Sequence, residues 1–159
     1  MTFAINGVSR SLLAQLTRHR MSSFTSASQH YADYSDMPMV VGEQLADNSE
    51  AESCLNWALR GYSRLAYDGV PIEEARQVLP NACAVNILWT VNARSLLNFF
   101  TQRLCKRNVE EMLTFASKVF DEVDNYWPEY AALCGPFCYM NGGDCNQGKM
   151  SCNEPFIGE

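Results

Sequence analysis

The stretch VSRSLLAQLTRHR at residues 8–20 combines an apolar stripe with a basic end. Its apolar side chains recur at steps of three and four residues, namely Val8, Leu12, Leu13 and Leu16. This spacing predicts an amphipathic helix that packs its stripe inward. Arg18, His19 and Arg20 follow at the expected C-terminal end, and Gln15 lies within one turn of them. The hydroxyl-rich residues that come next make this end of the helix a candidate anion site.

The segments on either side of this helix are predicted to be extended or irregular. Residues 3–6 read as a short strand, and Gly7 is expected to turn the chain into the helix. Residues 21–41 lose any period and are rich in serine and threonine, so we expect a loop that runs into an extended segment.

The middle of the chain predicts two helices. Ser49 followed by Glu52 resembles a capping box, and it opens a helix that Gly69 ends. Pro71 suits the first position of a shorter helix at residues 72–79, which carries Arg76.

The rest of the chain predicts a strand, two helices and a tail. Residues 81–89 read as a partly buried strand, after which Asn92 is expected to cap a helix. A further helix is predicted at 109–127. We therefore predict an α/β (α+β) fold: one mainly helical domain at 1–133 with a small, mostly antiparallel sheet, and a Cys/Gly-rich tail at 134–159.

Composition narrows the class of protein. The net charge of −6 argues against a main role in gripping nucleic acid, because such proteins usually carry a basic face. The sequence contains no run of about eighteen apolar residues, so no membrane span is predicted. The start of the chain lacks the apolar core of a secretory signal. We therefore expect a cytoplasmic protein that has no nucleic-acid or membrane partner. If the protein is viral, the expected location is the host cytoplasm.

Seven cysteines occur, an odd number, and three of them fall in predicted helices or strands. This suits reduced thiols better than a secreted disulfide framework, so disulfides are expected in the tail at most. The four tail cysteines lack the paired Cys-x2-Cys spacing of common zinc modules, and no metal site is predicted. Nine arginines against three lysines favour bidentate recognition of phosphate or carboxylate groups.

Two blocks together resemble the flavin-dependent thymidylate synthase family. The first is FAINGVSR at 3–10, then QLTRHR at 15–20 and Ser28 after seven more residues. The second is EEARQVLP at 73–80 and TVNARSLLNFFTQRL at 90–104. Both blocks occur in the order and at the separation that the family shows.

The resemblance implies reductive methylation of dUMP at C5. The carbon would come from methylenetetrahydrofolate and the hydride from FAD reduced by NADPH. Electrostatic activation of the uracil ring replaces a cysteine nucleophile in this family, so the seven cysteines need no catalytic role. The resemblance also implies a homotetramer with active sites built from several subunits.

The resemblance assigns roles to individual positions. The positions that match FAD contacts are Arg18, His19, Arg20, Ser26, Asn92, Arg94 and Asn98. The positions that match dUMP contacts are Gln15, Arg18, Ser28, Gln29, His30, Arg76 and Arg103. Arg103 and Ser28 are the catalytic candidates, and Arg103 is expected to lie against the uracil and favour its ionised form.

The chain departs from the family pattern in a few places. Ser26 stands where an acidic or amide residue is usual, and His30 replaces a phosphate-binding arginine. A histidine binds phosphate best when protonated, so dUMP binding is expected to depend on pH. The usual Ala-Gln-x-Glu-Ile pattern reads Asn108-Val109-Glu110-Glu111-Met112, which loses the glutamine. The family also carries several tens of residues before the first strand; either a compact, viral-type member or a longer reading frame would explain the difference.

Three other functions remain open from the residues. A member of the same family could hydroxymethylate dUMP or another pyrimidine nucleotide. A non-catalytic oligomeric protein could bind nucleotides through the same arginines. A DNA-binding module that uses 8–20 as its recognition helix is disfavoured by the acidic charge balance and by the second matching block.

Overall fold

The computed structural model describes residues 1–29 and 34–154 and divides into two compact units, Met1–Thr90 and Val91–Glu159. About half of the chain is helical, with one small sheet, so the predicted α+β class is confirmed. The single-domain boundary at 133 stays a prediction. No helix of the described residues is both long and apolar enough to cross a membrane.

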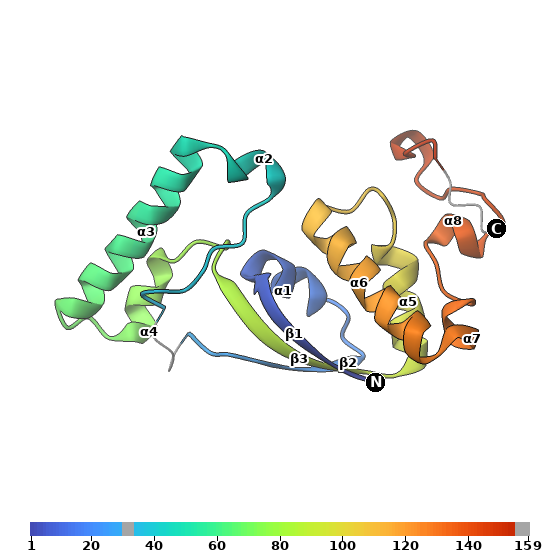
Figure 1. Cartoon of the computed structure of the whole chain (residues 1–159), viewed down its shortest axis with the longest axis horizontal. Helices are drawn as coiled ribbons and strands as arrows, with labels where there is room; N and C mark the ends of the chain where they lie inside the picture. The colour runs from blue at the N-terminus through green and yellow to red at the C-terminus, as the bar shows by residue number, and fades with distance from the viewer. Residues whose placement is uncertain (30–33, 155–159) are drawn as a thin grey trace. The chain divides into compact units, whose positions relative to one another are not determined.

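The first unit contains a three-stranded sheet in the order β1-β3-β2 (Figure 1). Its strands are β1 (Thr2–Ser9), β2 (Ser22–Ser26) and β3 (Ala84–Val91). The central strand β3 pairs antiparallel with β1 and buries alternate side chains, among them Ile87 and Trp89. The predicted first and last strands are confirmed, with shifted ends.

Two sequence expectations for this region were wrong. Gly7 does not begin the helix but lies within β1 at φ +67, where the register with β3 shifts. Glycine tolerates this left-handed conformation, so the strand passes through the bulge and continues to Ser9. The loop expected at 21–41 contains strand β2, whose Phe24 ring stacks on Trp89 at a centroid distance of 6.3 Å. A hydroxyl-rich edge strand of this kind lacks the apolar alternation that a sequence search looks for.

Helix α1 (Arg10–Leu16) begins where β1 ends. Ser9 caps it, because its hydroxyl accepts a hydrogen bond from the Leu12 backbone N–H at 2.9 Å. Leu12 and Leu16 are fully buried, as the apolar spacing predicted. Leu13 is only half-buried, and Val8 belongs to β1 instead of the helix.

The remaining elements of the first unit are helical. They are α2 (Glu43–Ala46), α3 (Ser49–Tyr67), α4 (Ile72–Ala75) and the 3-10 turn η1 (Arg76–Val78). Asn48, one residue before the predicted cap, accepts from the Ala51 N–H and caps α3. The short helix starts after Pro71 and tightens into η1 at Arg76, instead of running to 79. A small core around Tyr34 and Tyr62 joins α3 to α4.

The second unit is built on two contacting helices with aromatic side chains between them. Its elements are α5 (Ala93–Arg103), α6 (Glu110–Tyr126), α7 (Pro128–Ala131), α8 (Phe137–Met140) and the 3-10 turn η2 (Gly148–Met150). Phe99 and Phe115 meet edge to face at 6.0 Å, and Phe100 and Phe120 do so at 5.5 Å. Such buried aromatic pairs stabilise the unit by roughly 0.5–1.5 kcal/mol each beyond area burial. Helices predicted at 92 and 109 are thus confirmed.

Candidate functional site

The basic triplet lies just beyond α1. The helix ends at Leu16, and two further turn hydrogen bonds run from the N–H of Arg18 to the Gln15 carbonyl and from that of His19 to the Leu16 carbonyl. His19 is 8% exposed, whereas Arg18 and Arg20 on either side are exposed. The structure therefore brings the triplet and Gln15 together on one turn, with two forked donors directed outward.

The stretch after β2 supplies a second set of polar groups. Ser26 ends the strand, and Ser28 and Gln29 follow it. Gln29 is 7% exposed, and its amide nitrogen has no hydrogen-bond partner within the described residues. A buried amide N–H without an acceptor costs free energy, so we expect a further hydrogen-bond acceptor at this position. His30, the proposed phosphate ligand, lies outside the described residues.

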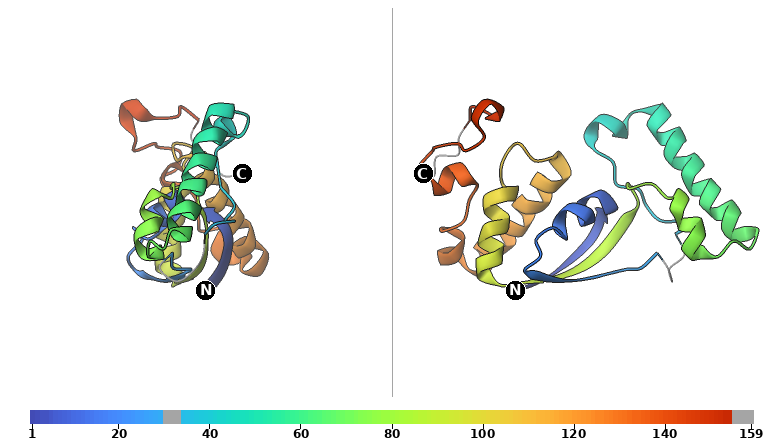
Figure 2. Two further views of the ribbon diagram at one scale, coloured as in Figure 1. Left: turned by 90° about the vertical axis from the view of Figure 1, so that its left-hand side faces the viewer. Right: turned by 180° about the vertical axis from the view of Figure 1, so that it is seen from behind.

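Arg76 lies at a different place in the first unit. It sits on η1, which packs against α3 and α4, and its Nε donates to the Glu73 carbonyl at 3.0 Å. The three views of Figures 1 and 2 place α1 over the sheet and α4 beyond the sheet's end beside α3. Helix α1, which precedes the triplet, and α4, which precedes Arg76, therefore lie at different places in the first unit.

Helix α5 and its N-cap residue carry four of the predicted site residues. Asn92 caps it as expected, since its side chain accepts from the Ser95 N–H at 2.8 Å. Arg94 and Asn98 are exposed and one turn apart, and Asn98 Oδ1 accepts from Gln102 at 3.2 Å. At about 100° per residue, Arg103 projects roughly 180° around the helix from Arg94. The two arginines thus serve different sides of α5.

Arg103 lines a pocket of about 370 Å³ within the second unit. Arg107 and Asn108 line it from the segment after α5, and Cys138, Cys145 and Gln147 line it from the tail. Half-burial lowers the pKa of Arg103 from its ordinary value because burial disfavours the charged form. Arginine stays charged at any physiological pH, so the pocket contains a partly desolvated cation.

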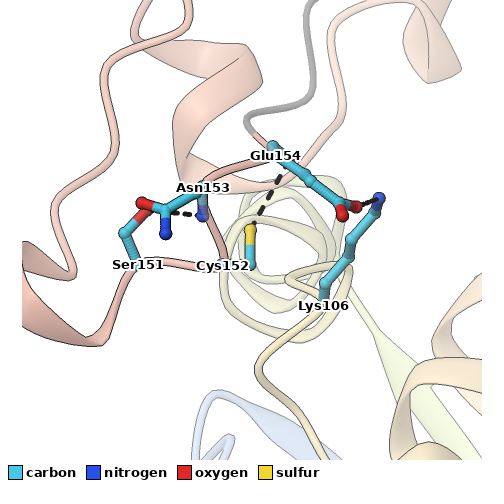
Figure 3. Close-up of polar contacts among 5 residues, drawn as sticks. All are labelled: Lys106, Ser151, Cys152, Asn153 and Glu154. Carbon is cyan, nitrogen blue, oxygen red and sulfur yellow. Dashed lines mark hydrogen bonds and ion pairs between the residues drawn. The ribbon is translucent and has the colours of Figure 1, made fainter.

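The tail is attached to the same segment by polar contacts (Figure 3). Lys106, three residues after Arg103, pairs with the carboxylate of Glu154. Cys152 donates to the Glu154 carbonyl at 3.5 Å, and the Asn153 N–H donates to Ser151 Oγ at 3.1 Å. The tail therefore forms one wall of the pocket that Arg103 lines.

The sequence prediction missed the contribution of the tail and of Asn108 to the lining of this pocket. The cysteine and glycine content of residues 134–159 indicated a distinct tail but not where it packs. All seven cysteines are free thiols. Among the described residues, no cluster of three or more histidine, cysteine or acidic side chains is suited to hold a metal ion.

Comparisons with known proteins identify the family. Residues 1–129 match the family described as thymidylate synthase complementing protein. The flavin-dependent thymidylate synthase of Clostridium tetani is 34% identical, over 96% of this chain and 69% of that protein. The enzyme of Geobacter sulfurreducens is 36% identical, over 96% of this chain and 68% of that protein. The enzyme of Sulfurisphaera tokodaii is 38% identical, over 88% of this chain and 56% of that protein. This chain therefore spans between about half and about two thirds of the length of these relatives.

Solved structures agree on the fold. A crystal structure of the flavin-dependent thymidylate synthase ThyX from Helicobacter pylori, complexed with FAD and dUMP, superposes with a TM-score of 0.73 at 24% identity. The superposition covers 84% of this chain and 72% of the Helicobacter pylori chain. A second structure of that enzyme with FAD and dUMP gives a TM-score of 0.67 at 25% identity, over 76% and 65%. The chain therefore belongs to the thymidylate synthase complementing protein family, the flavin-dependent thymidylate synthases.

Proposed function

We propose that this protein is an FAD-dependent thymidylate synthase that methylates dUMP to dTMP. Methylenetetrahydrofolate supplies the carbon, and FAD reduced by NADPH supplies the hydride. The observation that carries this proposal is the family match over residues 1–129, which includes the basic triplet and the α5 residues. The activity, co-substrates and partners of the whole protein are parts of this proposal.

The donor set fits FAD. Arg18, Arg20 and Arg94 are exposed forked cations of the kind that bind a pyrophosphate, and Asn98 offers an amide one turn from Arg94. We assign FAD contacts to these four residues and to His19, Ser26 and Asn92. FAD supplies the hydride chemistry when it is bound, and the protein's contribution is to hold and orient it.

Two features support binding of a pyrimidine nucleotide. The buried, unpartnered amide of Gln29 has a donor available for a ligand acceptor near Ser28. Gln15, Arg18 and Arg76 provide further contacts, with Arg76 and His30 assigned to phosphate. An arginine fork suits a phosphate, which accepts two parallel hydrogen bonds.

Arg103 is assigned the chemical role. A partly desolvated guanidinium beside the uracil stabilises negative charge on the ring, because screening by water is weaker there. The ionised ring is a better nucleophile at C5. Ser28 is the second catalytic candidate. In this role Arg103 needs no proton transfer of its own; it needs a fixed position.

Assembly into a homotetramer follows from the same proposal. Arg94 and Arg103 face opposite sides of α5, so one copy of this helix does not direct both side chains at one ligand. Helix α3 also leaves Trp57 73% and Tyr67 85% exposed. Exposed aromatic residues of this size are typical of subunit interfaces. A cytoplasmic location stays a prediction.

The first test is loading of the purified full-length chain with FAD, followed by absorbance and by tritium release from C5-labelled dUMP. We expect a yellow protein whose tritium release requires methylenetetrahydrofolate and NADPH. Mass spectrometry of the product separates methylation from hydroxymethylation. Protein that stays colourless after incubation with FAD contradicts both catalytic functions and leaves the nucleotide-binding alternative.

A further inference from the structure

Asn108 makes an unusual set of contacts at the end of α5. Its amide nitrogen lies 2.8 Å from the Gln102 carbonyl, 3.2 Å from that of Arg103 and 3.1 Å from that of Cys105. Its backbone N–H also donates to the Cys105 carbonyl at 2.9 Å. The last carbonyls of a helix have no partner inside the helix. The Asn108 side chain therefore caps α5 from outside the helix, five residues after its last residue, Arg103.

The other end of the same carboxamide meets Arg103. Arg103 Nη1 donates to Asn108 Oδ1 at 3.3 Å. Only one orientation of the amide satisfies both sets of contacts, because the reversed amide would turn its NH2 toward the guanidinium and its oxygen toward three carbonyls. The oxygen that faces Arg103 is thus fixed by the helix end itself.

Both side chains line the same pocket of about 370 Å³. An arginine side chain has several rotatable bonds and loses much rotamer freedom when it is held in one place. A neighbouring acceptor that is already rigid reduces the number of positions the guanidinium samples. The pocket wall therefore contains a cation together with the group that restrains it.

We propose that Asn108 is a positioning residue that holds the Arg103 guanidinium at the pocket. The inference rests on the proposed function, in which Arg103 activates the pyrimidine of the substrate. It adds a residue that stands where the family pattern quoted above has alanine. Asn108 itself needs no contact with the substrate.

The chemistry favours an amide over a carboxylate in this role. A neutral acceptor orients the guanidinium and leaves its charge available to the substrate. A carboxylate would pair with Arg103 and cancel much of its field at the uracil. It would also face three carbonyl oxygens without a hydrogen to donate, whereas the amide donates to them.

The first experiment measures the position of Arg103 without using activity. The full-length chain and its Asn108→Ala and Asn108→Asp variants are treated with phenylglyoxal, an arginine-selective dicarbonyl, and modification of each arginine is followed by peptide mass spectrometry. We expect Arg103 to react several times faster in Asn108→Ala, and no faster than in the unaltered protein in Asn108→Asp, which keeps the acceptor. The rate at Arg94 is the internal reference.

The two variants separate restraint from capping. If Asn108 only capped the helix, Asn108→Asp, which loses the donor hydrogens and repels the carbonyls, would loosen Arg103 at least as much as Asn108→Ala. Equal rates at Arg103 in Asn108→Ala and the unaltered protein overturn the proposal. If Asn108→Asp does not fold, equal rates at Arg103 in Asn108→Ala and the unaltered protein still overturn the proposal. Asn125→Ala, the same change at an exposed site on α6, is the matched control.

The second experiment uses the FAD-loaded enzyme. In Asn108→Ala we expect kcat to fall about tenfold, the factor expected for about 1.4 kcal/mol, with a smaller change in the KM for dUMP. In Asn108→Asp we expect the pH–rate profile to move to higher pH, because a neutralised Arg103 stabilises the ionised uracil less. Kinetics unchanged by both substitutions contradict the inference. A wild-type protein that binds no FAD instead contradicts the proposed function, and the dicarbonyl result still stands on its own.

Discussion

The ammonium group of Lys106 pairs with the carboxylate of Glu154, which lies 48 residues further along the chain (Figure 3). The pair joins the end of the tail to the segment that follows Arg103. Both side chains are well exposed, so water screens the pair and its contribution to the stability of the whole fold is small. Its effect is local: it keeps the tail against the pocket that Arg103 lines.

Reversal of one charge is expected to release the tail. Lys106→Glu should increase cleavage within residues 141–154 by a protease, with little change in the melting temperature. The double exchange Lys106→Glu with Glu154→Lys should restore protection, and Lys118→Glu on α6 is the matched control. Equal cleavage rates in the unaltered chain and Lys106→Glu would show that the pair does not hold the tail.

The same pair predicts a pH dependence of tail protection. A hydrogen bond with Lys106 lowers the pKa of Glu154. The contribution of Glu154 to holding the tail is therefore present above its unfolded pKa and is lost as pH falls through its folded pKa. The hydrogen bond with Glu154 raises the pKa of Lys106, so that contribution is lost only as pH rises through its folded pKa. Protection is therefore expected across neutral pH, with loss on the acid side below the usual carboxyl range. Proteolysis by a protease active over that range measures it.

Arg103→Ala is expected to abolish turnover while FAD stays bound. Removal of a donor that stabilises developing charge typically costs about 10²–10³ in kcat. Arg103→Lys keeps the charge but loses the fork that Asn108 accepts from, so it should restore only part of the rate. Flavin absorbance after gel filtration and tritium release from dUMP are the two measurements. Retained turnover in Arg103→Ala would show that another group activates the uracil.

The sequence predicted the helices well because their signals are local. The stripes in α5 and α6, the Leu12 and Leu16 positions of α1 and the cap at Asn92 are each set by neighbours a few residues apart, and these are found as expected. Strand β2 was missed, because what makes it a strand is its place beside β3. The bulge at Gly7 has the same origin: its N–H donates to the side chain of Asn86 at 3.0 Å, a partner 79 residues away.

The site shows the same division between local and distant signals. The triplet and the α5 residues were predicted as site residues through motifs, each contained in a short block. The contacts of Asn108 with Arg103 and of the tail with Lys106 were not predicted, because they form only in the folded chain. No pattern in CGPFCYMNGGDCNQGKMSC, residues 134–152, indicates which helix end it covers.

Asn92 allows the capping and flavin roles to be separated. Asn92→Ala removes the hydrogen bond to the Ser95 N–H and should lower stability by about 0.5–2 kcal/mol. Asn92→Ser keeps a capping oxygen and should be nearly as stable as the unaltered protein. If Asn92 also contacts FAD, both variants should bind FAD more weakly than their stabilities explain. Urea unfolding without FAD and flavin titration give the two quantities, and normal FAD affinity in Asn92→Ser would restrict Asn92 to capping.

Cys145 is expected to be the most reactive of the tail thiols and to report on the pocket. Hydrogen bonds from the Ser151 side chain and the Gln147 backbone hold the pKa of Cys145 below its ordinary value. Burial raises the pKa of Cys83 and of Cys134, so at neutral pH these two should react with iodoacetamide far more slowly.

The Cys145 adduct would stand in the wall of the Arg103 pocket. Alkylation should therefore raise the KM for dUMP in the FAD-loaded enzyme, and Cys145→Ser should remove this sensitivity while turnover is retained. Cys54, which is also exposed but lies on α3, controls for simple accessibility. Peptide mass spectrometry over time gives the order of reaction. Alkylation of Cys145 without any change in dUMP kinetics would separate the tail from the substrate site, because a group added to a shared wall has to alter access to the guanidinium behind it.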